Sequence, residues 1–159
     1  MSLLDKEPVK RVEKVLKEFD QSISVIILEN TARTAKDAAE SLNCEIGAII
    51  KSLVFKAEET YVLSLIAGDK RCSLNKLKKI INKKDVSMAN PEEVKTQTGY
   101  TIGGVSPIGH LNPIKIFIDK SLERFNDLYA AAGHPNCVFK IDFKNIQKIT
   151  NGEIKELTE

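Results

Sequence analysis

The segment from Gly103 to Gly109 is the part of the sequence whose residue types most strongly suggest chemistry. It reads Gly-Gly-Val-Ser-Pro-Ile-Gly, so three glycines and one proline occur within seven residues. Glycine lets the backbone approach a ligand closely and adopt conformations that other residues avoid. Backbone N–H groups presented in this way can bind a phosphate or stabilise a developing oxyanion. The alternative is a tight turn with a β-bulge and no ligand.

A second candidate is Lys51, which interrupts the apolar run from Ala48 to Phe55. A buried ammonium group is costly unless it reaches water or an anion. Two interpretations stay open. Lys51 points to solvent from a half-exposed strand, or its ammonium lies at the mouth of a pocket and binds a phosphate as a point charge.

A third candidate is the segment Ala130–Asn136, which combines small residues with a histidine and an amide. Gly133 allows close approach, and His134 and Asn136 offer directional hydrogen bonds. An ordinary turn is the alternative, because Gly, Pro and Asn are all turn formers. The other histidine, His110, is a weaker candidate.

Lysines also crowd the segment 76–84, at positions 76, 78, 79, 83 and 84. Such a run forms either a solvated helix face or a track for nucleic-acid phosphates. No aromatic residue lies among these lysines, so stacking of bases on them is not predicted.

Several other kinds of site are excluded by their missing motifs. The three cysteines, Cys44, Cys72 and Cys137, form no CxxC pair, which favours a reducing cytoplasm over a disulfide framework. Neither histidine has the spacing of a zinc site. GxSxG, the P-loop and a GxGxxG after a strand are all absent. We therefore expect no metal, no cofactor and no cysteine nucleophile.

The elements that must position these residues alternate between helix and strand. Helical periodicity and capping residues predict helices at about 7–19, 34–42, 73–81, 90–98 and 142–149, with a short turn capped by Asp119. Apolar and β-branched runs predict strands at 24–28, 47–56, 61–67, 114–118, 128–132 and 137–141. A hairpin over 57–60 implies antiparallel pairing. This pattern favours an α+β fold, a mixed, curved sheet with helices packed outside it.

Length and charge agree with one globular unit. The chain has 159 residues and a net charge of only +2, so a strongly basic nucleic-acid binder is not indicated, although a local basic patch is permitted. We expect a single domain over 1–159, with its core at about 9–149 and a polar tail at 151–159. No apolar run approaches the length of a membrane span, and the N-terminus lacks the features of a signal peptide.

Three blocks, in this order, resemble the YbaK/ProX family of aminoacyl-tRNA editing domains, which also occur inserted in bacterial prolyl-tRNA synthetases. The blocks are Ile50–Val54, Met88–Val94 and Thr98–Gly109. The resemblance covers roughly Val9 to Ile149. It implies a barrel-like mixed sheet surrounded by helices, and hydrolysis of the ester that joins a wrong amino acid to the terminal adenosine of a tRNA.

The resemblance also implies roles for particular residues. Lys51 matches the family lysine that holds a phosphate or the terminal nucleotide. Gly103–Pro107 matches the GxxxP loop that lines the aminoacyl pocket, and Gly133 with His134 falls in a second glycine loop. The predicted catalytic residues are Lys51, Gly103, Gly104, Ser106 and Pro107. The predicted substrate-binding residues are Lys51, Ser52, Gly103, Gly104, Val105, Ile108, Gly109, Gly133, His134 and Asn136.

Two positions differ from the pattern of cysteine-specific members. Those members have a tyrosine on the early strand, whereas the corresponding residues here, Val25–Leu28, include no tyrosine. Val138 stands where those members have an acidic residue. The expected substrate is therefore tRNA(Pro) carrying Ala, Cys, Ser or another small residue. The predicted partners are the 3′ end of aminoacyl-tRNA and prolyl-tRNA synthetase. A relative that binds tRNA or nucleotide without catalysis, or a module that docks on a synthetase, remains the alternative.

Overall fold

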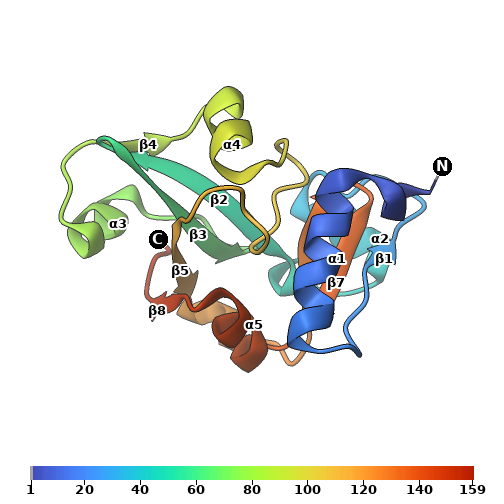
Figure 1. The fold of residues 1–159 in the computed structure, drawn as a ribbon. Helices are drawn as coiled ribbons and strands as arrows, with labels where there is room; N and C mark the ends of the chain where they lie inside the picture. Colours follow the sequence, from blue (N-terminus) through green and yellow to red (C-terminus); the bar gives the residue numbers. More distant parts are fainter. Residues whose placement is uncertain (1) are drawn as a thin grey trace.

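Two β-sheets and five α-helices make up residues 2–159, the part of the chain that the computed structural model describes (Figure 1). The α-helices are α1 (Glu7–Phe19), α2 (Ala35–Leu42), α3 (Leu74–Ile81), α4 (Pro91–Thr98) and α5 (Phe143–Thr150). The strands are β1 (Ile26–Ile27), β2 (Ile50–Ala57), β3 (Thr60–Ala67), β4 (Val86–Met88), β5 (Lys115–Asp119), β6 (Leu128–His134), β7 (Cys137–Ile141) and β8 (Glu153–Lys155). Three short 3-10 helices, η1 (Leu3–Asp5), η2 (Ile46–Ala48) and η3 (Lys120–Arg124), connect them.

The helices begin where their capping residues predict. The side chains of Thr34, Ser73 and Asp142 each accept a hydrogen bond from the first turn of α2, α3 and α5. At α4 the capping box is complete, because Asn90 and Glu93 each bind the backbone N–H of the other. These caps satisfy N–H groups that a helix cannot pair internally, and they fix the helix starts.

The larger sheet has the strand order β4-β2-β3-β5-β8. The β2–β3 hairpin is antiparallel, with Ile50 opposite Ala67 and Ala57 opposite Thr60, whereas β5 joins β3 in parallel. On the other side of β2, the short strand β4 pairs only with Phe55–Ala57. The edge of β2 over residues 50–54 is consequently left without a partner strand of this sheet.

The smaller sheet has the order β1-β7-β6 and is antiparallel throughout. Its β6–β7 pairing is irregular between Ala131 and His134, where a β-bulge displaces the chain. A single parallel bridge between Ile49 and Tyr129 connects it to the larger sheet. The predicted mixed α+β class is confirmed, but the two sheets do not close into a barrel, because one bridge replaces a continuous ladder.

The helix α1 covers the smaller sheet (Figure 1). Its apolar face, Val9, Val12 and Leu16, is completely buried, as the helical spacing of these residues predicts. The same core cluster includes residues of both sheets, among them Leu65 and Phe139. The two sheets therefore share one hydrophobic core, which holds them in a fixed relation.

The structure differs from the sequence prediction in several segments. The strand expected over 24–28 is reduced to Ile26–Ile27, and residues 46–48 form η2 instead of opening β2. β4 was not predicted, because three residues give too short a pattern. The expected polar tail instead adds β8 alongside β5, and Leu157 is completely buried. Within residues 2–159 no helix is both long and apolar enough to cross a membrane.

Candidate active site

A cavity of about 340 Å³ opens beside the unpartnered edge of β2 and reaches the smaller sheet. Its walls come from six parts of the chain. They are the start of α2 (Ala32–Ala35, Ala38), β2 with the residue before it (Ile49–Val54), the β4–α4 segment (Met88, Ala89, Val94), the glycine loop (Ile102, Gly103, Val105), β6 with the turn after it (Tyr129–Ala131, His134, Pro135) and β7 (Cys137, Val138). Most of these side chains are apolar, as is usual for a small-molecule site.

The cavity exists because of two features of the strands. β4 is too short to cover residues 50–54 of β2, and the bulge in β6 turns the chain away before His134. Small side chains at Ala35 and Ala38 then let α2 approach this opening without filling it. The space is thus a product of strand lengths and small residues.

Lys51 lies where this cavity meets a second surface groove, since it lines both. Its side chain is half-buried, and its Nζ donates a hydrogen bond to the backbone carbonyl of Lys70. Burial lowers the pKa of Lys51 below its usual value, and the nearby charge of Arg71 lowers it further. Lys51 is therefore partly solvated and lies between the two spaces, and its binding to a phosphate stays a prediction.

The neighbouring Ser52 carries an unsatisfied hydroxyl group. Its Oγ is buried at the cavity wall and has no hydrogen-bond partner within residues 2–159. A buried hydroxyl without a partner costs free energy, which a bound group with a donor or acceptor would recover. Ser52 therefore gives the mostly apolar wall one polar contact point.

The glycine loop reaches the cavity with only part of its length. Gly103 and Val105 line the cavity, and Gly103 has a φ of 97°, in the left-handed region that favours glycine. Within residues 2–159, the N–H groups of Gly103 and Val105 donate to no protein acceptor, whereas the N–H of Gly104 donates to Thr101 O at 2.9 Å. Two residues of this wall thus carry backbone N–H groups that the described part of the chain leaves without an acceptor.

Gly104 has a packing role instead. A Cβ at this position would lie 2.9 Å from the backbone nitrogen of His134 and 3.1 Å from the carbonyl carbon of Gly133. The two glycine loops predicted from sequence therefore touch each other through their backbones at Gly104. Gly133, with a φ of 91°, packs in turn against the backbone of Pro8.

His134 lines the cavity in a defined protonation state. Its Nδ1 accepts a hydrogen bond from the backbone N–H of Asn136 at 3.0 Å, so the neutral ring carries its proton on Nε2. Burial lowers the pKa of His134, with further lowering by the charges of Lys6 and Arg33. The ring is therefore neutral near pH 7. Asn136 itself does not line the cavity; its side chain donates to Leu28 O at 3.2 Å.

The rest of the glycine loop lies behind the cavity wall. Ser106, Pro107 and Ile108 are buried but do not line the cavity, and the carbonyl of Ser106 accepts a hydrogen bond from His110 Nε2 at 2.7 Å. Burial lowers the pKa of His110, which keeps this ring neutral as well. These residues therefore support the loop from behind and do not reach the space where a ligand would bind.

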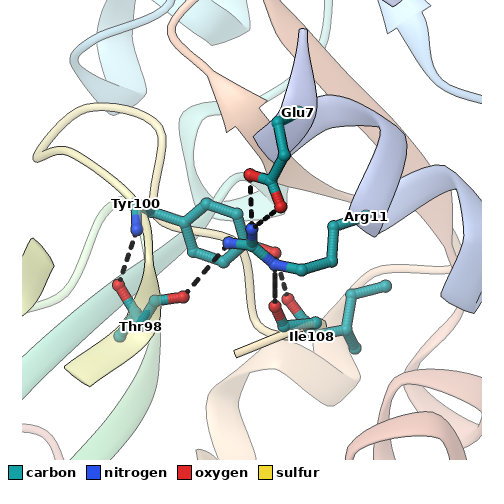
Figure 2. A network of polar contacts seen from close by, with 6 residues as sticks. Glu7, Arg11, Thr98, Tyr100 and Ile108 are labelled. Carbon is teal, nitrogen blue, oxygen red and sulfur yellow. Dashed lines mark hydrogen bonds and ion pairs between the residues drawn. The ribbon is translucent and has the colours of Figure 1, made fainter. Parts of the chain in front are cut away.

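A polar clamp closes the base of the glycine loop, and Figure 2 shows its members. Arg11 on α1 donates from Nε to Gly109 O at 2.6 Å and from Nη2 to Thr98 O at 3.3 Å. Glu7 holds the same guanidinium group at 2.5 Å, and the group lies 4.7 Å from the centre of the Tyr100 ring. Tyr100 donates from its hydroxyl to Ile108 O at 2.7 Å. Through Arg11, α1 is thereby joined to Thr98, which precedes the glycine loop, and to Gly109 at its end.

Removing one donor of this clamp is expected to destabilise the fold. Tyr100 is completely buried, so Tyr100→Phe leaves the carbonyl of Ile108 without this partner and lowers the free energy of unfolding by about 1–3 kcal/mol. Urea titration measures the change. Tyr61→Phe is the matched control, because the Tyr61 hydroxyl binds Glu93 in a partly exposed position. Glu93 keeps its contacts with Asn90 and Lys56, so this variant is expected to lose less stability than Tyr100→Phe. Equal effects of the two variants would contradict the clamp.

Sequence reasoning missed several residues of the cavity. Arg33, Ile102 and Tyr129 line it, although the sequence analysis does not predict any of them as a site residue. The alanines of α2 offered a signal, because Ala35, Ala38 and Ala39 form a stripe of small residues that allows a close approach. The lysines of the 76–84 run lie elsewhere: Lys78, Lys79, Lys83 and Lys84 line a separate shallow hollow, and Lys76 donates to Thr158 O.

Cys137 is a cavity residue with little nucleophilic character. It is completely buried, and burial raises the pKa of its thiol above the usual value. The pKa of Cys72 is raised to about 11 for the same reason. A thiol rather than a thiolate is therefore present at neutral pH, and the thiol is a poor nucleophile.

We accordingly expect a variant with Cys44, Cys72 and Cys137 all changed to Ala to retain the deacylase activity that the sequence resemblance implies, provided that it folds. Single-turnover deacylation assays measure this. Cys137→Ala alone separates folding from chemistry, because it removes only one buried sulfur. Loss of turnover in Cys137→Ala with an unchanged unfolding midpoint would show that the thiol takes part in the reaction.

Comparison with known proteins identifies the family. The family model described as "Aminoacyl-tRNA editing domain" matches residues 29–149, which is most of the chain. The chain therefore belongs to the aminoacyl-tRNA editing domain family, and membership confirms the predicted class of enzyme, an aminoacyl-tRNA deacylase. Within residues 2–159, no group of three or more His, Cys, Asp or Glu side chains is arranged to hold a metal ion.

Individual relatives agree with this assignment. The chain is 31% identical over 126 residues to a protein of Enterococcus faecalis named as a candidate Cys-tRNA(Pro)/Cys-tRNA(Cys) deacylase, EbsC, covering 79% of this chain and 77% of that one. It is 32% identical over 119 residues to the proline–tRNA ligase of Thermosipho melanesiensis, covering 75% of this chain but 21% of that enzyme. A crystal structure of a candidate trans-editing enzyme for prolyl tRNA synthetase superposes with a TM-score of 0.91 at 34% identity, over 97% of this chain and 98% of that one.

Proposed function

We propose that this protein removes a wrongly attached small amino acid from tRNA(Pro) in trans. The observation that carries the proposal is the cavity itself, a mostly apolar space that Lys51 shares with the neighbouring groove. Two of its lining residues, Gly103 and Val105, have backbone N–H groups with no acceptor within residues 2–159. The side chain of a residue such as Ala is small and apolar, whereas the nucleotide to which the aminoacyl group is joined is anionic. A cavity of this kind therefore suits the two halves of the substrate.

The reaction requires little from the protein beyond positioning and charge stabilisation. An aminoacyl ester is already activated compared with a peptide, so water or a hydroxyl group of the substrate can serve as the nucleophile. In the proposed arrangement Lys51 holds the phosphate of the terminal nucleotide. The N–H groups of Gly103 and Val105 donate hydrogen bonds to the carbonyl oxygen as negative charge develops on it.

The walls favour a small amino acid side chain and disfavour a cationic one. Among the lining residues the charged side chains are Arg33 and Lys51, and no carboxylate is present. Val138, which stands where cysteine-specific members have an acidic residue, is itself part of the wall. The Enterococcus relative is named for cysteine. For this chain we propose Ala, Cys or Ser, with the unpartnered hydroxyl of Ser52 close to the bound group.

The proposal is tested by a deacylation panel in which tRNA(Pro) is charged with Ala, Ser, Thr, Cys or Pro. We expect the purified chain to hydrolyse at least one of the small mischarged esters well above the spontaneous rate, and to leave Pro-tRNA(Pro) intact. Tight binding of tRNA without turnover for every ester would contradict the proposal and favour a non-catalytic binder.

A synthetase-associated module is a second candidate, because related domains lie inside proline–tRNA ligases. The same panel with added prolyl-tRNA synthetase distinguishes the two functions. Turnover by the chain alone supports the independent enzyme, and turnover only in the presence of synthetase supports the module.

A further inference from the structure

A second surface groove lies next to the cavity and shares part of its wall. The groove has a volume of about 510 Å³, and Lys51, Leu53 and Met88 line both spaces. Its other lining residues are Phe55, Gly68–Cys72 and Leu74. The cavity and the groove meet at Lys51. An extended ligand that leaves the cavity past this lysine therefore enters the groove directly.

The groove combines an apolar floor with a cationic rim. Leu53 and Phe55 of β2 form part of the floor, and two further apolar side chains stand unusually open to solvent: Met88 is 57% exposed and Leu74 is 39% exposed. Lys51, Lys70 and Arg71 supply the positive charge. Apolar surface beside fixed cations suits a ligand that carries planar bases and phosphates together.

The positive charge of the rim is only partly offset by the protein, because Asp69 is the one acidic residue of the described chain that lines the groove. The one carboxylate among the lining residues belongs to Asp69, and Arg124 already binds it at 2.7 Å and 3.0 Å. Within residues 2–159, neither Lys70 nor Arg71 forms an ion pair. The Lys51 ammonium is held towards this loop by its hydrogen bond to the carbonyl of Lys70. Three cations thus line the groove beside one carboxylate, Asp69, which is already paired with Arg124.

We infer that this groove binds the single-stranded 3′ end of the tRNA, the nucleotides that precede the terminal adenosine. Lys70 and Arg71 contact phosphates, while Leu74 and Met88 present apolar surface to the bases. The inference rests on the proposed function, because the aminoacyl group must occupy the cavity for the preceding nucleotides to reach the groove. An acidic peptide fits less well, since it would not use the apolar floor at the same spacing as the cations.

The test compares two substrates that differ only in the nucleotides bound by the groove. One is the mischarged tRNA from the deacylation panel, and the other is the same amino acid esterified to adenosine alone. The variant is the double substitution Lys70→Ala/Arg71→Ala, which keeps the backbone carbonyl that Lys51 binds. Lys144→Ala/Lys148→Ala on α5 is the charge-matched control, because both lysines are exposed and neither lines the cavity or the groove.

We expect the groove variant to lose about 10-fold or more in kcat/KM on the aminoacyl-tRNA, as expected for lost charge-assisted contacts, and to hydrolyse aminoacyl-adenosine like the wild type. Each phosphate contact to a single strand contributes roughly 0.7 to the slope of log affinity against log salt, so the slope should fall by about 1.4. The α5 control should change neither value.

Two results would overturn the inference: an unchanged kcat/KM and salt slope on aminoacyl-tRNA, or an equal loss on both substrates. Binding of the trinucleotide CCA, compared with adenosine, provides a readout independent of catalysis. If the wild type hydrolyses neither ester, the proposed function is wrong. Equal affinity of wild type and groove variant for CCA would then reject the groove as well, whereas weaker CCA binding by the variant would support it.

Discussion

Gly103→Ala is expected to lower the rate of deacylation by about 10²-fold while the protein remains folded. Gly103 has a φ of 97°, and an L-residue in this left-handed region costs about 1–2 kcal/mol. A Cβ would also lie 3.3 Å from Cγ of Arg33 at the cavity wall. The peptide planes beside Gly103 would therefore rotate, and the free N–H groups of Gly103 and Val105 would lose their aim at the carbonyl oxygen. Loss of one such donor typically costs about 10²–10³-fold in rate.

The measurement is single-turnover deacylation with a saturating concentration of protein, which separates the chemical step from binding. Gly152→Ala is the control, because a Cβ there meets the side chain of Ile118 at 2.9 Å, and neither residue lines the cavity. It should lower stability without changing the rate. Wild-type turnover in folded Gly103→Ala would exclude the glycine loop as the source of oxyanion stabilisation.

A comparison of Gly103 with Gly104 shows why the sequence alone does not single out Gly103→Ala. The sequence marks Gly103 and Gly104 equally, and both belong to the same motif. Only the structure separates them, because the N–H of Gly104 is already bound to Thr101 O and its Cα faces the backbone of His134. A side chain at Gly104 would force the two loops apart, so its replacement tests folding before it tests chemistry.

Local elements were predictable because their signals are local. The capping residues Thr34, Ser73, Asn90 and Asp142 mark helix starts within a few residues of sequence, and the structure confirms each of them. The extended tail was not predictable, because β8 depends on parallel pairing with β5, more than 30 positions earlier in the chain. Pairing over such a distance leaves no pattern in a segment of three residues.

Only some of the site residues predicted from the sequence line the cavity. Lys51, Ser52, Gly103, Val105 and His134 were predicted as site residues, and all of them line the cavity. The sequence also predicts Ser106, Pro107, Ile108 and Gly109 as site residues, because they continue the motif, but none of them lines the cavity. The loop turns away after Val105, and its end is held by Arg11 and Tyr100 instead. The motif contains residues that stabilise the loop as well as residues that line the cavity. The sequence alone does not distinguish these two groups.

Lys51→Ala is expected to reduce kcat/KM on aminoacyl-tRNA by about 10²-fold, because a charge-assisted contact with phosphate is worth about 1.5–3 kcal/mol. Lys51→Arg keeps the charge but changes its shape and reach, so it should rescue only part of the activity. A phosphate-bound lysine stays charged near neutral pH, so no ionisation in the pH–rate profile should disappear with Lys51→Ala. A step between roughly pH 7 and 8 that vanishes in the variant would instead make Lys51 a general base.

Stability measurements separate this role from a structural one. Burial and Arg71 lower the pKa of Lys51 in the folded protein below 10.5, the value for an unperturbed lysine. The charged form therefore opposes folding at every pH below the lowered pKa, and this cost disappears as the pH rises from the lowered pKa to above 10.5. Lys51→Met, which keeps the length of the side chain without its charge, should be at least as stable as the wild type near pH 7, with an advantage that shrinks at alkaline pH. A loss of stability at pH 7 would show that the ammonium group stabilises the fold through its hydrogen bond to the carbonyl of Lys70. A stable but inactive variant is the result expected if Lys51 binds the substrate.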